Sequence, residues 1–163
     1  MIINKLVKIF FLSSVMIKSL ILPSVHSVDM NDCTIVNNNN INNKTYLFCN
    51  DKEKWNDANT FCRENNGDLL TISSIAESDW IYNKRQTINS MNSDVWVGLK
   101  TTNMVTWNWK SGEDGYINWK PGTPNGFRII NCARLHPASK YIDDRKCSYK
   151  FDFICELPGP TTT

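Results

Sequence analysis

The sequence predicts one α+β domain that is closed by disulfide bonds and exported from the cell. Two segments with helical periodicity come first, and several strand-like segments follow in the same compact stretch. Six cysteines span this stretch, from position 33 to position 155. An even number of cysteines, placed at both ends of a compact segment, is typical of domains from an oxidising compartment.

Residues 1–27 have the pattern of a secretory signal peptide. Two lysines precede an apolar run, and short side chains around Ser27 suit a signal peptidase. The alternative is an anchor helix that stays in the membrane, but Lys18 and Pro23 interrupt the ~20 apolar residues that a span needs. We therefore expect cleavage near Ser27 and a secreted, extracellular protein.

Removal of this leader changes the formal net charge of the chain from +2 to −1, because the leader holds three lysines and no acidic residue. The mature chain then has no basic field that would attract a nucleic acid, so we expect no nucleic-acid partner. Its length suits a single core, and disulfides compensate for the modest size.

Residues 28–45 are polar and rich in asparagine, without apolar periodicity. We expect this N-terminal segment to be loose. It contains the sequon Asn43-Lys44-Thr45, which makes Asn43 the candidate glycosylation site of a secreted chain.

Two helices are predicted after a short first strand. The first carries apolar side chains at helical spacing and ends at Asn66-Gly67, a pair that suits a left-handed cap. The second begins at the capping box of Ser74 and Glu77 and turns Trp80 and Ile81 toward the core.

Strand and turn patterns dominate the rest of the chain. The expected strands and extended segments are 46–48, 95–99, 107–109, 116–119, 132–135 and 151–156, and residues 158–163 are expected to form a frayed tail. The sequence therefore places its helices before most of its strands, which is the pattern of an α+β domain.

Seven short motifs follow one another in a characteristic order along the mature chain. They are Trp55…Phe61-Cys62, Gly67-Asp68-Leu69-Leu70-Thr71-Ile72, Trp96-Val97-Gly98-Leu99, Trp107-Asn108-Trp109, 118–125, Asn131-Cys132-Ala133 and Phe153-Ile154-Cys155-Glu156. Each motif alone is weak, whereas the ordered set is specific. It resembles the C-type lectin-like domain over residues 33–157. The resemblance implies two helices packed on antiparallel sheets, with a long loop region.

The resemblance also implies the disulfide pairing. Six cysteines allow fifteen pairings, and the spacing alone does not choose among them. By resemblance the pairs are Cys62–Cys155 and Cys132–Cys147, which leaves Cys33–Cys49 as the additional N-terminal bridge of the family's longer form. Cys49 lies a few residues later than is usual in that form.

Lectins of this family bind sugars through Ca²⁺, which takes about six to eight oxygen ligands. Thr123-Pro124-Asn125 matches the motif Glu-Pro-Asn of mannose-type sites, with a hydroxyl in place of the charged ligand. Asn131 stands just before Cys132, near a position that is often Glu. Asp143-Asp144 matches the Asn-Asp pair of the last motif, with a carboxylate in place of the amide.

The candidate carbohydrate and calcium-binding residues are Thr123, Asn125, Asn131, Asp143 and Asp144, and the metal ligands among them would be Asn125, Asp143 and Asp144. Two carboxylates and two amides could hold Ca²⁺, though less tightly than a fully acidic set. The alternative is that these polar side chains only satisfy the backbone of turns. The sequence leaves both interpretations open. Tryptophans 96, 107, 109 and 119 are expected to pack in the core and loops, and Phe127, Arg128 and Tyr141 lie near the predicted loops.

An enzyme is not expected, because the mature chain has one histidine, His136, no nucleophile motif, and no cysteine outside the expected bridges. The sequence favours a secreted, carbohydrate-binding C-type lectin with a mannose-type site, in recognition or immune modulation, and leaves its calcium dependence open. The alternative is a calcium-independent domain that binds a protein, as an antagonist or toxin does. The expected partners are glycans or glycoproteins. Nothing in the chain supplies the clustering that strengthens weak sites, so two alternatives stay open: a simple soluble lectin, or a homo-oligomer that forms through the domain's own surface.

Overall fold

The computed structural model describes residues 29–38, 40–88, 91–126 and 131–159. The predicted signal peptide lies outside the described residues, and so do the last four residues of the predicted tail. Within the described residues, no helix combines the length and the apolar character that crossing a membrane requires.

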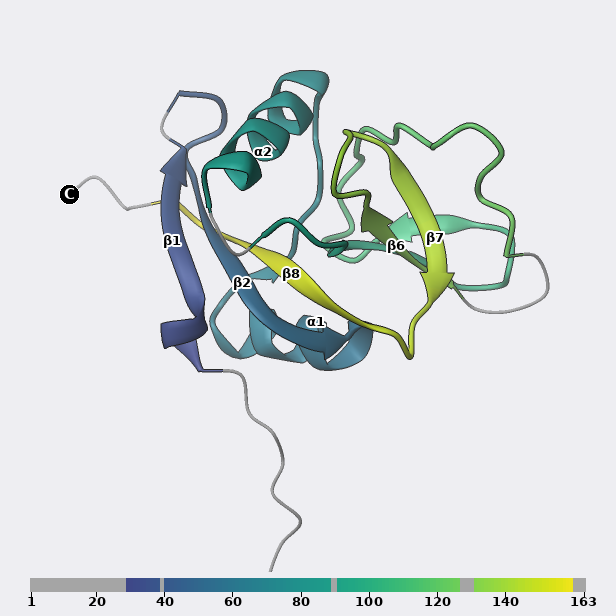
Figure 1. The fold of residues 1–163 in the computed structure, drawn as a ribbon, viewed down its shortest axis with the longest axis horizontal. Coiled ribbons are helices and arrows are strands. Elements are labelled where there is room, and N and C mark those ends of the chain that lie inside the picture. Colours follow the sequence, from purple (N-terminus) through teal and green to yellow (C-terminus); the bar gives the residue numbers. More distant parts are fainter. Residues whose placement is uncertain (1–28, 39, 89–90, 127–130, 160–163) are drawn as a thin grey trace, which may run out of the picture.

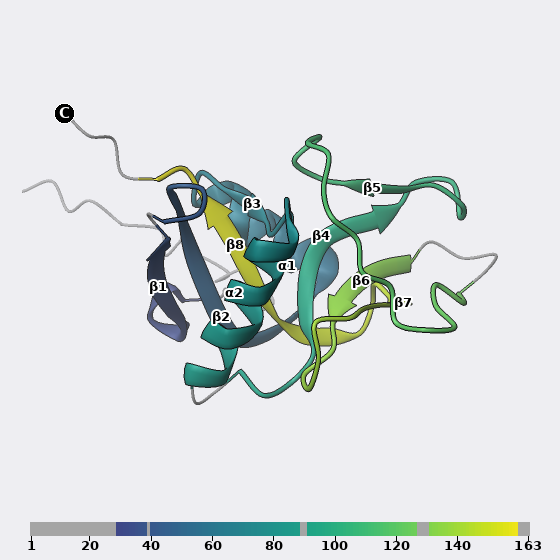
Figure 2. The same cartoon turned by 90° about the horizontal axis from the view of Figure 1, so that it is seen from above.

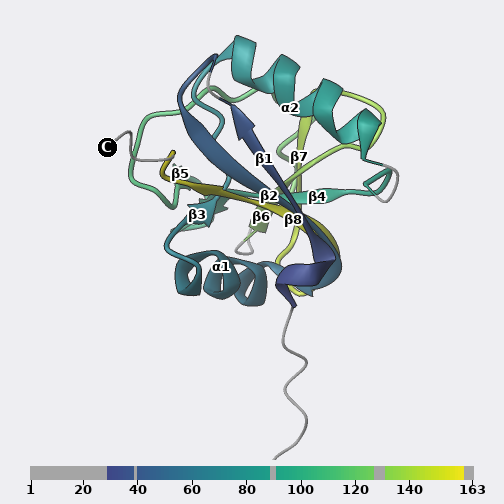
Figure 3. The same ribbon diagram turned by 90° about the vertical axis from the view of Figure 1, so that its left-hand side faces the viewer.

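Eight strands form one sheet, and two helices lie on opposite sides of its β1-β2-β8 part (Figures 1 and 3). The strand order is β1-β2-β8-β4-β6-β7, with β3 paired to β8 and β5 paired to β4. The helices are α1 (Trp55–Glu64) and α2 (Ile75–Thr87), and a short 3-10 turn covers Met30–Asp32. The strands are β1 (Cys33–Asn38), β2 (Lys44–Lys54), β3 (Asp68–Leu69), β4 (Val95–Thr101), β5 (Trp107–Trp109), β6 (Asn131–Leu135), β7 (Ile142–Lys146) and β8 (Lys150–Leu157). The pairing is antiparallel except between β4 and β8.

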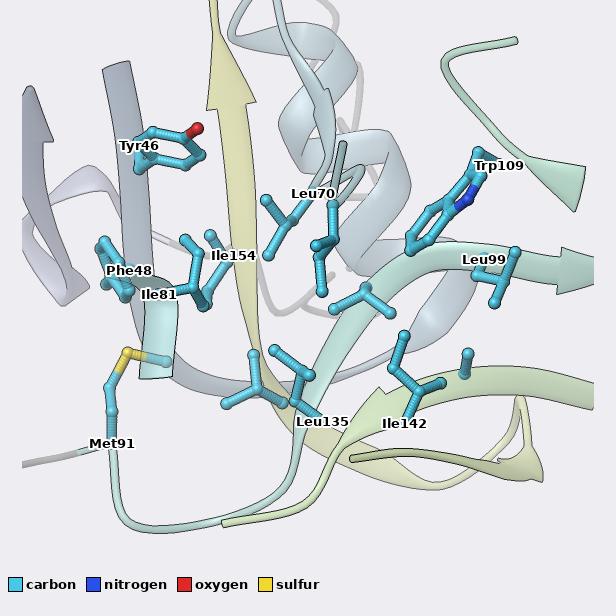
Figure 4. Packing of buried hydrophobic residues seen from close by; sticks show 14 residues of the cluster. Tyr46, Phe48, Leu70, Ile81, Met91, Leu99, Trp109, Leu135, Ile142 and Ile154 are labelled. Atoms are coloured by element: carbon cyan, nitrogen blue, oxygen red, sulfur yellow. The ribbon is translucent and has the colours of Figure 1, made fainter. Parts of the chain in front are cut away.

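The core is split into two apolar clusters by the alternation of side chains along the strands. In β2, Tyr46 and Phe48 belong to the cluster that includes Ile81 of α2. Their neighbours Leu47 and Cys49 belong to the cluster that includes α1. Figure 4 shows the first cluster, in which side chains from β2, β4, β8 and α2 meet. The predicted helices therefore cover the two faces that β2 and β8 offer.

The first helix, α1, ends where the sequence predicts, and the second, α2, begins where the sequence predicts. Asn66 has a left-handed backbone (φ 60°), and the Gly67 N–H donates to the Cys62 carbonyl oxygen at 2.9 Å. At the start of α2, the Ser74 hydroxyl accepts from the Glu77 N–H at 3.1 Å. The Glu77 carboxylate accepts from the Ser73 N–H at 2.7 Å, so it caps one residue earlier than the usual capping box.

The expectation of a loose segment at 28–45 is wrong for residues 33–38, which form the edge strand β1. Half of its residues are exposed, including Ile35, and Asn38 is the buried one, so the strand leaves no apolar pattern in the sequence. Pairing holds it instead: Cys33 lies opposite Cys49 and Asn38 opposite Lys44 in the ladder with β2.

The three disulfide bonds join the pairs that the family resemblance implies. Cys33–Cys49 joins β1 to β2, Cys62–Cys155 joins α1 to β8, and Cys132–Cys147 joins the start of β6 to the turn after β7. In the described residues no cysteine is free. The bridge with a sequence separation of 93 closes nearly the whole domain, which in the chain-entropy account contributes roughly 4–5 kcal/mol.

Residues 110–126, which follow β5, are the described part of the long loop region and lie beside β6 and β7 (Figure 2). Backbone hydrogen bonds fix its described part. The Tyr116 N–H donates to the Ile72 carbonyl oxygen. The Ile142 N–H of β7 donates to the Asn118 carbonyl oxygen at 2.8 Å, and the Lys120 N–H donates to the Ile142 carbonyl oxygen at 2.8 Å. These anchors hold residues 123–126 beside β7.

Candidate functional site

The candidate site is centred on Asp144, which lies on β7 and is almost fully buried. One carboxylate oxygen, Oδ1, accepts from the Asn125 N–H at 2.8 Å. The other, Oδ2, accepts from the Gly126 N–H at 2.8 Å and from the Asn131 side-chain amide at 3.1 Å. Three N–H donors therefore face this one carboxylate.

Asn131, on β6, also hydrogen-bonds to the same loop. Its Nδ2 donates to the Gly126 carbonyl oxygen at 2.7 Å as well as to Asp144. Its backbone N–H donates to the Thr101 hydroxyl at 2.9 Å. At Gly126 the fit is close, because a Cβ there would overlap the Asn131 amide and the Asp144 carboxylate. The loop backbone therefore rests directly on these two side chains.

Asp143 points away from this cluster, because successive side chains of a strand alternate between its two faces. Its Oδ2 accepts from Arg134 Nη2 at 2.8 Å and lies 3.1 Å from Arg145 Nη2. Arg134 also pairs with Asp94. Burial and the neighbouring Arg145 lower the pKa of Arg134. Asp143 thus belongs to a separate network of two arginines and two aspartates.

The remaining candidates lie on the loop itself. The Thr123 hydroxyl donates to the Lys120 carbonyl oxygen at 2.7 Å, and the Thr123–Pro124 peptide bond is cis. The Asn125 side chain is exposed and makes no side-chain hydrogen bond to the described part of the chain. The structure thus brings Thr123, Asn125, Asn131 and Asp144 together and leaves Asp143 apart.

As placed, these residues do not fit a calcium ion. Ca²⁺ needs about six to eight oxygens, whereas both Asp144 oxygens accept N–H groups and Asn131 presents its amide nitrogen. Asp143 faces two guanidinium groups. Across the described residues, no group of three or more His, Cys, Asp or Glu side chains is arranged to hold a metal ion.

A small pocket of about 110 Å³ opens beside Asp144 and Asn131. Met104, Val105, Trp107 and Pro124 provide its apolar lining. Met104 is 49% exposed and Val105 is 81% exposed. We call these four residues the loop face. Sequence reasoning missed Met104 and Val105, although two apolar residues within the polar segment 101–106 are a usable signal.

The turn between β4 and β5 holds the tip of the loop face in place. The Asn103 carboxamide oxygen accepts from the N–H groups of Val105 and Thr106, at 3.2 and 2.7 Å. Across the turn, the Thr102 N–H donates to the Thr106 carbonyl oxygen at 3.2 Å. Met104 and Val105 are thus displayed by a turn that is closed by its own hydrogen bonds.

Other residues that the sequence singled out have structural roles. Trp96 and Trp109 are buried, and Trp107 meets Trp119 edge to face at 4.8 Å between ring centroids. The prediction that the tryptophans pack in the core and loops is thereby confirmed. Phe127 and Arg128 lie outside the described residues, and Tyr141 is exposed in the turn before β7.

The sequence profile of the family "Lectin C-type domain" matches residues 51–157, well over half of the chain. The chain belongs to the C-type lectin domain family. Human lithostathine-1-beta is 32% identical over 117 residues, which cover 69% of this chain and 70% of that protein. The lectoxin-Phi1 C-type lectin of Philodryas olfersii is 30% identical over 119 residues, covering 69% and 76%.

Solved structures agree with this assignment. Human lithostathine superposes with a TM-score of 0.68 at 25% identity, covering 78% of this chain and 98% of that one. The carbohydrate-recognition domain of the mouse scavenger receptor C-type lectin gives 0.66 at 29% identity, covering 81% and 98%. A calcium-independent type II antifreeze protein gives 0.65 at 21% identity, covering 78% and 98%, which shows the shared fold alone.

Proposed function

We propose that this C-type lectin domain is a calcium-independent recognition module that binds a protein or glycoprotein partner through the loop face. The observation that carries the proposal is that three N–H donors hydrogen-bond to Asp144 and engage both of its carboxylate oxygens. A carboxylate bonded in this way stabilises the loop without a metal ion. The family consists of binding domains, so the function proposed is recognition and not catalysis.

The exposed apolar side chains of the loop face favour a protein surface as the partner. Met104 and Val105 are adjacent, half exposed and largely exposed respectively, and next to an apolar pocket. A turn closed by hydrogen bonds displays them. Ordering a loop before binding lowers the entropy cost of association. Apolar side chains at the centre of an interface are the usual anchors of protein recognition.

The test is a binding screen of the fluorescently labelled mature chain against an array of secreted and cell-surface ectodomains in EDTA. We expect binding that Val105→Asp abolishes. Ile35→Asp is the matched control, because Ile35 is also apolar and exposed but lies on β1. Binding that needs calcium, or that Val105→Asp leaves intact, contradicts the proposal.

Calcium-dependent binding of mannose-type sugars is the second candidate function. It is favoured by the uncommitted Asn125 side chain next to Asp144, with Pro124 before it. Retention on mannose-agarose, with and without EDTA, tests it. Retention that EDTA releases and that Asn125→Ala or Asp144→Ala removes would establish this function in place of the first.

We also infer that the protein is secreted and carries a glycan at Asn43. The three disulfide bonds support an oxidising compartment. Asn43 is exposed in the turn between β1 and β2, with a left-handed backbone. Expression in a eukaryotic secretory host, followed by mass measurement of the secreted chain, tests cleavage near Ser27 and glycosylation together.

A further inference from the structure

A second hollow lies away from the loop face, between α2 and the turn that precedes β7. α2 and this turn lie side by side in Figures 1 and 3. One wall is a face of α2, on which Ile75, Ser78, Asp79 and Tyr82 follow at helical spacing. The hollow has a volume of about 480 Å³, within the usual range of small-ligand sites. We call it the α2 groove.

The opposite wall is built from two further segments. Tyr116 and Asn118 come from the long loop region, and residues 138–141 come from the turn before β7. Three tyrosine rings from three separate segments thus line one groove. Their hydroxyl groups and the Asn118 amide make no side-chain hydrogen bond to the described part of the chain, so they are available to a ligand.

The walls are fixed to one another before any ligand binds. Arg85 and Gln86 of α2 donate to the carbonyl oxygens of His136 and Pro137, at 3.4 and 3.5 Å. Lys140 Nζ lies 2.6 Å from Asp79 Oδ1 across the groove. The other wall is held by the bond of 2.8 Å from the Ile142 N–H to the Asn118 carbonyl oxygen. Binding would therefore require little ordering.

The chemistry of the groove selects a neutral, hydroxyl-rich ligand. Tyrosine rings offer flat apolar faces with polar tips, and the C–H faces of a pyranose ring can lie against such surfaces. The amide and hydroxyl groups can both donate and accept, as a sugar hydroxyl requires. The two charged lining residues, Asp79 and Lys140, neutralise one another, so the groove has no net charge to attract an ionic ligand.

Another hollow, of about 380 Å³, adjoins the α2 groove, and Tyr141, Ala138 and Ser139 line both of them. Tyr141 is thus the ridge between two neighbouring hollows. From these observations we propose that the α2 groove binds a neutral oligosaccharide without calcium, with one sugar ring against the tyrosines and the chain continuing across Tyr141. This site is separate from the loop face and stands independently of the function proposed there.

The test is an NMR titration of the ¹⁵N-labelled mature chain in EDTA with mannotriose, lactose and diacetylchitobiose. We expect at least one sugar to shift the amide signals of α2, residues 116–118 and residues 138–141. Tyr141→Ala and Asn118→Ala should each weaken this binding roughly two- to tenfold, as expected for loss of one aromatic or hydrogen-bonded contact.

Two controls separate a groove effect from a general one. Tyr149→Ala removes another exposed tyrosine, in the turn before β8, and should leave sugar affinity unchanged. Val105→Asp alters the loop face and should also leave it unchanged. The proposal is overturned if no sugar shifts these signals, if the shifts lie at the loop face, or if neither groove variant weakens binding. Preference for sialyllactose or for a proline-rich peptide over all three neutral sugars overturns it as well.

Discussion

Replacement of Lys44 by methionine should destabilise the domain much more at pH 8 than at pH 5. The Lys44 ammonium lies 3.0 Å from Glu156 Oε2 and 3.6 Å from Glu113 Oε2. The Glu156 side chain is only 7% exposed, and burial raises its pKa to about 7 while the bond from Lys44 acts against this rise. Methionine keeps the length of the side chain and removes the charge.

The sign follows from proton uptake. Because the pKa of Glu156 is raised on folding, the folded chain binds a proton that the unfolded chain has released between about pH 4.5 and 7. Stability from this group therefore falls as pH rises through that window, by about 1.4 kcal/mol per pH unit at most. Removing Lys44 raises the folded pKa further and extends the fall above pH 7. A charged hydrogen bond is worth about 1.5–3 kcal/mol, and Lys44 is 23% exposed, so we expect an added loss of about 1–2 kcal/mol at pH 8.

Urea unfolding followed by tryptophan fluorescence at pH 5 and pH 8 measures both values for the original chain and the variant. Lys140→Met is the matched control, because Lys140 pairs with Asp79 on an exposed part of the surface. An equal loss at both pH values for Lys44→Met would refute the argument, since the loss would then not depend on ionised Glu156.

Further predictions concern the disulfide framework, the loop anchor and the ionic network. Cys62→Ser should abolish secretion, because it removes roughly 4–5 kcal/mol of chain constraint; normal secretion, measured by immunoblot of the medium, would count against the framework. Gly126→Ala should force the loop off Asp144 and Asn131, seen as shifted amide signals of residues 123, 125 and 126, whereas Gly112→Ala, where a Cβ meets no atom and the positive φ of 79° confines the strain to its own turn, should leave those signals in place. Asp143→Ala should cost roughly 3 kcal/mol in urea unfolding, because the buried Arg134 then loses one of its two carboxylate partners and keeps only Asp94; a loss under about 1 kcal/mol would show that Asp94 alone is enough to hold Arg134.

The sequence predicts the helices well because their signals are local. Asn66-Gly67 and Ser74 end and begin helices through contacts within a few residues. The edge strand β1 gives no such signal, since long-range pairing with β2 and the bridge from Cys33 hold it while half of its residues, Ile35 among them, stay exposed.

The sequence shows which residues meet at the candidate site, but it does not show which hydrogen bonds they form there. Family resemblance locates Asn125, Asn131 and Asp144, which do meet. Two of the three N–H groups that hydrogen-bond to Asp144 come from the loop backbone, and the third comes from the Asn131 side chain. The identity of a residue does not show where its backbone N–H will point. Alternation along β7 removes Asp143 from the cluster, and the partner that holds it, Arg134, stands on the neighbouring strand.

The tethering of residues 125 and 126 to Asp144 has a consequence for where the domain can work. Under the function proposed above, a loop whose shape rests on the chain's own amides needs no divalent ion to keep that shape. A fall in free calcium would then not release a partner captured there, so dissociation would have to be driven by competition or by cleavage of the partner.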